Sequence, residues 1–367
     1  MCRLRSRRFG ICEAFSAAVA VLLVLLFEVD SVAQSSLDGN ILQTPQVFRF
    51  AAPPTMAITP APQADPAGLI RIPVTVVDEA GQCVASLSAR DFSLSVDGED
   101  RPIAWFRPNR STSAALGVLV DISESMAFKS WSGGTFSKLP FVRAALEMVV
   151  NKLDAHDDVF LATFARRFHM LNDFTTDLRD IEERLPMLRV ADQLDDFGGS
   201  GIYESVMKGI SVLAHAPTTC DRRALLVFTD AADSSNHGAD DVIAKAQFAG
   251  VTIYNIVAQG FQIETDLPSI RNGMGRIAAE TGGLTFVVNM WREGDRLFSD
   301  ADEIVSELDN QYVLGFSVPQ WGSNAVPVEL MLPHHPGMRV RAPRVVRFRP
   351  DDLFRQVATP PTQILPE

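Results

Sequence analysis

The chain has 367 residues, of which 47% are hydrophobic and 21% are charged, and its formal net charge at pH 7 is −12. This composition is typical of a globular protein, and the length allows two ordinary domains or one domain with substantial additions. An acidic chain without a basic cluster binds nucleic acid poorly, so we expect no nucleic-acid partner and favour cations or basic partners.

The first 33 residues have the pattern of an export signal. Four arginines precede the apolar run 14–27, and Ser31-Val32-Ala33 fits a small-x-small cleavage site. The run is short for a membrane span. We therefore expect cleavage, no stable membrane insertion afterwards, and a periplasmic or extracellular location. An uncleaved anchor is the alternative. Removal of residues 1–33 would leave 29 basic and 42 acidic residues, a net charge of −13.

The segment 34–68 is rich in Pro and Ala, which predicts a disordered linker. Residues 69–110 follow as a predicted N-terminal β segment of short strands separated by turns. Within it, Asp97-Gly98 lies between two apolar stretches and predicts a hairpin.

Strands alternate with helices between residues 111 and 310. The predicted strands are 116–121, 158–165, 223–230, 251–258 and 284–288, and the predicted helices lie near 138–153, 177–188, 202–214, 239–249, 267–280 and 299–309. Several of these strands are continuous apolar runs, as a parallel sheet buried on both faces requires. The pattern predicts an α/β domain with a doubly wound, mostly parallel sheet and helices on both faces.

After residue 310 the chain returns to β character in a C-terminal β segment, 311–350, before a polar tail, 351–367. The two β segments are each too small to fold well alone. We expect them to pair into one small β-sandwich-like module in which the α/β domain is inserted. Two independent appendages are the alternative.

Short oxygen-bearing side chains follow the predicted strands. Asp121, Ser123 and Ser125 come after the first strand of the α/β domain, Asp230 ends another, and Ser200 precedes the predicted helix 202–214. Ligands of open α/β sheets bind at the carboxyl ends of strands. Two carboxylates and three hydroxyls form an all-oxygen set that suits Mg²⁺, Mn²⁺ or Ca²⁺ and disfavours zinc and copper. We predict a metal site, with Mg²⁺ as the first choice and some ligands acting through water.

The same residues carry a resemblance to a known family. Asp121-Ile-Ser123-Glu-Ser125 matches the DxSxS motif of von Willebrand factor type A (VWFA) domains, which hold a metal-ion-dependent adhesion site (MIDAS). GGSGIYES (198–205) resembles the segment with their third loop ligand, usually Thr and here Ser200. FTDAAD (228–233) resembles the segment with their second Asp, here Asp230, although Ala231 replaces the usual Gly. The flanking β segments resemble those of VWFA-related bacterial proteins first noted in Acidobacteria, so the resemblance covers about residues 70–348.

The resemblance implies a VWA/Rossmann-like fold and a non-enzymatic adhesion or assembly module. Its partner would be a protein that offers an acidic side chain to the metal. One alternative is a metal-dependent hydrolase that uses the same site, and another is a structural envelope module with a vestigial site. The sequence has no phosphate loop and no HExxH motif, and GGSGI (198–202) departs from a nucleophile elbow at Ile202.

Two cysteines, Cys83 and Cys220, lie beyond the predicted signal. In an exported protein they could form a disulfide bond. Their separation in the sequence does not indicate whether they pair, so two unpaired thiols are an equal alternative.

Overall fold

The computed structural model describes residues 69–108, 113–129, 135–191, 200–217, 220, 222–234, 236–259, 263–290, 293–317 and 324–348. All of them belong to one compact unit of the chain, Thr59–Glu367. The predicted signal peptide, the linker 34–68 and the tail 351–367 lie outside the described residues.

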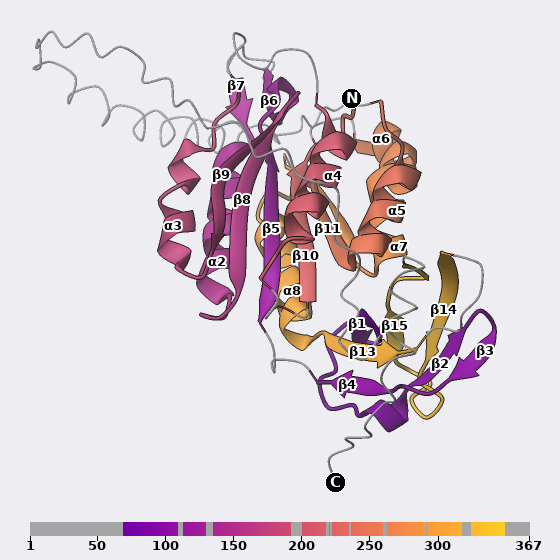
Figure 1. Cartoon of the computed structure of the whole chain (residues 1–367). Coiled ribbons are helices and arrows are strands. Elements are labelled where there is room, and N and C mark those ends of the chain that lie inside the picture. The colour runs from indigo at the N-terminus through magenta and orange to yellow at the C-terminus, as the bar shows by residue number, and fades with distance from the viewer. Residues whose placement is uncertain are drawn as a thin grey trace, which may run out of the picture. The chain divides into compact units, whose positions relative to one another are not determined.

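The described residues form three groups of elements (Figure 1). The first β segment contains β1 (Ile70–Val77), β2 (Ser93–Val96), β3 (Glu99–Arg101) and β4 (Trp105–Arg107). The α/β domain contains β5 (Ala114–Asp121), β6 (Ala127–Lys129), β7 (Thr135–Ser137), α2 (Leu139–Lys152), β8 (Asp158–Phe164), β9 (Phe168–Thr175), α3 (Leu178–Glu182), α4 (Ile202–Leu213), β10 (Arg222–Thr229), α5 (Ala239–Ala249), β11 (Val251–Gln259), α6 (Ile263–Ile270), α7 (Arg276–Thr281), β12 (Thr285–Asn289) and α8 (Arg296–Asn310). The last β segment contains β13 (Tyr312–Phe316), β14 (Ala325–Met331), β15 (Arg339–Arg341) and β16 (Val345–Arg347).

A six-stranded sheet forms the centre of the α/β domain, in the order β12-β11-β10-β5-β8-β9. Every neighbouring pair is parallel except β8 and β9, which are antiparallel. Every residue of β5 and of β10 is buried. Burial on both faces explains why these strands are uninterrupted apolar runs in the sequence.

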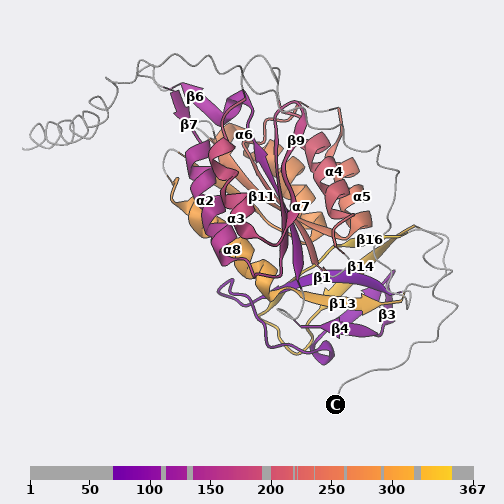
Figure 2. The ribbon, with the colours of Figure 1, turned by 60° about the vertical axis from the view of Figure 1, so that its left-hand side comes forward.

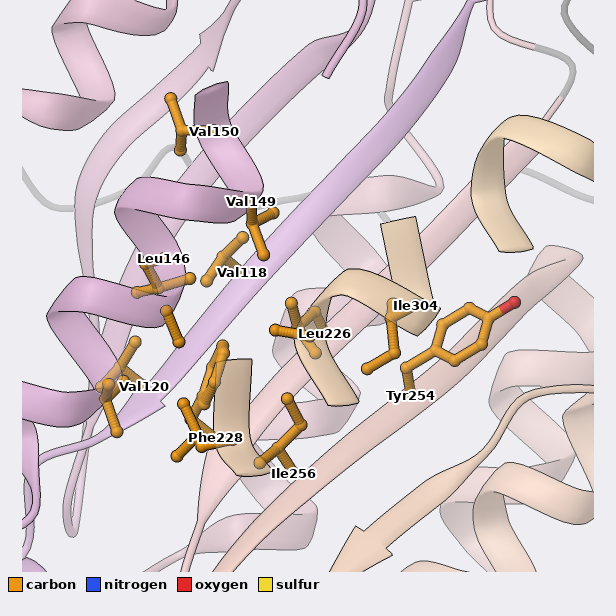
Figure 3. Close-up of a cluster of buried hydrophobic side chains, with 14 of the residues drawn as sticks. Val118, Val120, Leu146, Val149, Val150, Leu226, Phe228, Tyr254, Ile256 and Ile304 are labelled. Carbon is orange, nitrogen blue, oxygen red and sulfur yellow. The ribbon is translucent and has the colours of Figure 1, made fainter. Parts of the chain in front are cut away.

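Helices cover both faces of this sheet. On one face, the strands pack against α2 and α8, and Figure 3 shows side chains of β5 and β10 next to Leu146 of α2 and Ile304 of α8. On the other face they pack against α4, α5 and α7. Each large aliphatic side chain buried in this way contributes about 1.5–3 kcal/mol. The close packing leaves no room at Gly117 of β5, where an added Cβ would lie 2.4 Å from the Phe160 ring.

The two β segments on either side of the α/β domain form one module. Its sheets have the orders β15-β1-β13-β4 and β16-β14-β2-β3, and β1 pairs with β13 in antiparallel register. Figure 2 shows β1 and β13 next to each other. Side chains of both sheets share a single hydrophobic core. The predicted doubly wound sheet inside a β-sandwich-like module is therefore confirmed.

Local turns agree with the sequence in some places and differ in others. The hairpin at Asp97-Gly98 joins β2 to β3, with positive φ angles of 54° and 79°. By contrast, the single helix predicted near 267–280 is divided into α6, a π-helical turn at Arg271–Gly275 and α7. Pro268 lies inside α6, where proline removes a backbone donor. The helix predicted near 177–188 is the short α3 followed by a 3₁₀ turn, Leu185–Met187.

Cys83 and Cys220, which both lie among the described residues, are not joined by a disulfide bond. Cys83 is partly exposed, and burial raises the pKa of its thiol. Within the described part of the chain, every helix is too short or too polar to cross a bilayer.

Candidate metal centre

Three strand ends bring the predicted site residues to one edge of the central sheet. β5 ends at Asp121, and β10 ends at Thr229, directly before Asp230. The strands are parallel neighbours, so their carboxyl ends meet. The end of β8 holds the adjoining loops, because the Ile122 N–H donates to the Phe164 carbonyl at 2.7 Å and the Gly201 N–H donates to the Ala165 carbonyl at 2.8 Å.

Asp121 lies at the centre of the predicted site residues and is completely buried. Its Oδ1 accepts a hydrogen bond from the Ser123 N–H at 2.9 Å. Its Oδ2 accepts from the hydroxyls of Ser200, at 3.1 Å, and Thr229, at 2.7 Å. Burial raises the pKa of Asp121 to about 6, and the negative charge of Asp230 acts in the same direction. The bonds from Ser123 and Thr229 oppose this rise because they stabilise the ionised carboxylate.

The two serines of the DxSxS segment lie on the solvent side of Asp121. Ser123 is buried and its Oγ is 3.0 Å from the Oγ of Ser125, which is exposed. A 3₁₀ turn, Glu124–Met126, places both hydroxyls on the same side of the backbone. The cluster is thus buried at Asp121 and open to solvent at Ser125.

Asp230 is buried beside a lysine. The Nζ of Lys138 donates to Oδ2 of Asp230 at 3.2 Å, and the two side chains are 4% and 7% exposed. The Ala232 N–H donates to Oδ1 at 3.2 Å, and the side-chain amide of Gln259 donates to the Asp230 carbonyl. The next residue, Ala231, has a φ of 66°. This left-handed backbone explains why glycine is usual here in domains that the sequence resembles, since alanine adopts it only with strain.

Ser200 is held by the segment that follows Asp230. Its carbonyl accepts hydrogen bonds from the N–H and the hydroxyl of Ser234, at 2.8 and 3.1 Å. Asp233 caps the start of α4, because its Oδ1 accepts from the N–H groups of Ile202, at 2.9 Å, and Tyr203, at 3.4 Å. Tying α4 to the Asp230 loop fixes the position of the Ser200 hydroxyl against Asp121.

The five residues predicted from the sequence therefore lie in one cluster. Asp121, Ser123, Ser125 and Ser200 are linked by hydrogen bonds, and the charge of Asp230 acts on Asp121. The donor set contains only oxygen, which fits a hard divalent cation. The described residues contain no group of three or more His, Cys, Asp or Glu side chains that could hold a metal ion, and this cluster offers two carboxylates and three hydroxyls instead.

Three residues that contact the predicted ligands or hold their segments in place are not among the residues predicted from the sequence: Thr229, Lys138 and Asp233. Thr229 ends β10 directly before Asp230, so its position in the sequence could have indicated that it lies next to the site. Lys138 precedes the first turn of α2, and nothing in its spacing indicates that its side chain reaches Asp230, which is 92 residues away.

Residues 116–232 match the family model described as von Willebrand factor type A domain. The matched stretch runs from β5 to just beyond Asp230 and includes every predicted site residue. This part of the chain is a von Willebrand factor type A domain. No curated protein matches the sequence.

Solved structures with some similarity include bacterial and animal proteins. BatB, a conserved hypothetical protein from Bacteroides thetaiotaomicron, has a TM-score of 0.38 and 17% identity over 52% of this chain and 97% of its own. The PilB minor pilin from Streptococcus sanguinis has a TM-score of 0.41 and 15% identity over 54% and 62%. Proximal thread matrix protein 1 from the mussel byssus, with a zinc-occupied MIDAS motif, has a TM-score of 0.39 and 13% identity over 57% and 48%. These TM-scores and sequence identities are too low to support a statement about the function of this chain.

Proposed function

We propose that this chain is an exported protein-interaction module that binds its partner through a divalent metal. The metal would be held by Asp121, Ser123, Ser125, Ser200 and Asp230, with Mg²⁺ preferred over Mn²⁺ and Ca²⁺. The observation that carries the proposal is the hydrogen-bonded cluster of oxygens around Asp121, which is buried on the protein side and open at Ser125. The family match to a von Willebrand factor type A domain supports an interaction module.

Burial of two carboxylates at a strand end is unfavourable unless a cation compensates them. A divalent ion would supply that compensation and retain coordination positions for water or for a partner. It would also supply local positive charge in a chain whose net charge is −12. The partner group that fits this chemistry is an acidic side chain, whose carboxylate would replace a metal-bound water.

A binding role fits the surroundings of the cluster better than hydrolysis. A metal-dependent hydrolase needs a general base beside the metal. Two acids that could serve as this base are engaged elsewhere: Asp233 caps α4, and Glu204 forms an ion pair with Lys208 at 2.9 Å. This pair lowers the pKa of Glu204, which makes it a weaker base.

Water-proton relaxation with Mn²⁺ tests the proposed open coordination position. We expect Mn²⁺ to enhance relaxation when the protein is present, because the bound ion keeps exchangeable water. Acetate should reduce this enhancement by replacing water, whereas acetamide, which is neutral and has the same shape, should not. No enhancement above that of free Mn²⁺ would contradict the proposal. Metal-dependent turnover of a generic phosphate or carboxylic ester would instead favour the hydrolase alternative.

A further inference from the structure

The ion pair between Lys138 and Asp230 lies inside the proposed metal centre and has no role in the function proposed above. Nζ of Lys138 is 3.2 Å from Oδ2 of Asp230, and Lys138 as a whole is 3% exposed. A lysine buried to this extent is stable in its charged form only next to an opposite charge. Its partner is one of the two carboxylates that would hold the metal.

The backbone of Lys138 is fixed by the same loop that carries the DxSxS serines. The Lys138 N–H donates at 2.9 Å to the carbonyl of Met126, the last residue of the 3₁₀ turn. Its carbonyl accepts from the N–H groups of Phe141, at 3.1 Å, and Val142, at 3.2 Å, in the first turn of α2. Both the DxSxS loop and α2 therefore hold Lys138 in place, and its side chain spans from α2 to the end of β10.

The charges of the cluster show what the lysine does. Ionised Asp121 and Asp230 carry two negative charges, and the Lys138 ammonium compensates one of them. A divalent cation added to this set would leave an excess of positive charge in a buried site, where like charges repel strongly. A carboxylate from a partner would remove that excess.

We propose that Lys138 is a built-in counter-cation that competes with the divalent metal for Asp230 and thereby sets the metal affinity of the site. This inference rests on the proposed metal-dependent function and extends it. In the metal-free protein the ammonium stabilises Asp230 and keeps the cluster assembled. Metal binding must overcome the repulsion of the ammonium. The site therefore binds metal weakly alone and more tightly when an acidic partner adds its negative charge, and by linkage the metal strengthens partner binding to the same degree.

Calorimetric titration of Mg²⁺ and Mn²⁺ into Lys138 variants of the full chain tests this competition. Lys138→Met removes the charge and keeps an unbranched side chain, and we expect it to bind metal about tenfold more tightly than the wild type, since removing a like charge near a divalent ion favours binding. Lys138→Gln serves as a second neutral variant if the methionine variant does not fold. Lys138→Arg keeps the charge and should bind like the wild type. The matched control is Lys152→Met, at the exposed end of the same helix, which should also bind like the wild type.

The outcomes separate this inference from the proposed function. If the wild type binds metal and the neutral Lys138 variants bind it equally well, the inference is overturned and the proposed function stands. If only the neutral variants bind, Lys138 blocks the site, which supports the competition and overturns metal-dependent binding by the natural chain. If none of the proteins binds either metal, both ideas fail. Thermal unfolding in EDTA gives a second readout, in which the counter-cation role predicts a lower melting temperature for Lys138→Met than for Lys138→Arg.

Discussion

Replacing Thr229 by valine tests how the fold holds Asp121 in its buried position. The Thr229 hydroxyl donates to Oδ2 of Asp121 at 2.7 Å and accepts from the Ala231 N–H at 3.1 Å. Valine has nearly the same shape, so the variant removes both hydrogen bonds without leaving a cavity. A hydrogen bond to a charged group contributes about 1.5–3 kcal/mol and a neutral one about 1 kcal/mol. We therefore expect Thr229→Val to lower the free energy of unfolding by about 3 kcal/mol and to raise the pKa of Asp121 further.

Urea unfolding at pH 7.5 in EDTA, followed by circular dichroism, measures this loss directly. The matched control is Thr252→Val in β11, because the Thr252 hydroxyl is completely buried and has no hydrogen-bond partner among the described residues. Removing an unpaired buried hydroxyl should leave stability unchanged or increase it. This interpretation is refuted if the free energy of unfolding of Thr229→Val lies within about 0.5 kcal/mol of the wild-type value. It is also refuted if Thr229→Val and Thr252→Val lower the free energy of unfolding equally.

Three further predictions concern pH, backbone strain and packing. The pKa of Asp121 in the folded chain, about 6, lies above its unfolded value, so the contribution of this carboxyl to the stability of the metal-free protein should increase as the pH falls from 7 to about 4. Asp121→Asn should therefore change the dependence of the free energy of unfolding on pH in urea titrations, and an identical pH profile in both proteins would contradict the assignment. Ala231→Gly should raise the free energy of unfolding by up to about 1 kcal/mol, because glycine adopts the φ of 66° without strain. A lower free energy of unfolding in the same urea assay would show that the backbone at Ala231 is not strained. Gly117→Ala should lower the free energy of unfolding by about 1–3 kcal/mol and with it the melting temperature, since the new Cβ would lie 2.4 Å from Phe160 and 2.7 Å from Leu225. An unchanged melting temperature would mean that these side chains move aside at little energetic cost.

The fold was predictable because its main signal is periodic. Buried parallel strands such as β5 and β10 are continuous apolar runs, which hydrophobicity alone reveals. β9 was not predicted because it is an antiparallel strand at the sheet edge in which no residue is fully buried, so its sequence, FHMLNDFT, has no clear apolar pattern. The division of the helix near 267–280 into α6, a π-helical turn and α7 depends on local hydrogen bonding that apolar spacing does not encode.

The candidate site was predictable only to the extent that it follows strand ends. Asp121 and Asp230 end apolar runs, and parallel strands bring such residues together. Thr229 and Asp233 act through hydrogen bonds to Asp121 and to the start of α4, and these contacts depend on how the chain is arranged in space. Lys138 is the clearest case, because a lysine before a helix is usually solvated, and only the packing of α2 against the sheet buries it beside Asp230.

The central claim is that the oxygen cluster binds a divalent metal, and calorimetry with a single-hydroxyl variant tests it most directly. Ser125 is exposed and its hydroxyl contacts that of Ser123, so Ser125→Ala removes one predicted ligand with little effect on the fold. Ser299→Ala, at an exposed position of α8, is the matched control. The account predicts saturable Mg²⁺ or Mn²⁺ binding by the wild type and by Ser299→Ala, and affinity reduced about tenfold or more in Ser125→Ala, equivalent to about 1.4 kcal/mol. Saturable binding that Ser125→Ala leaves unchanged, or no binding by the wild type, would contradict it.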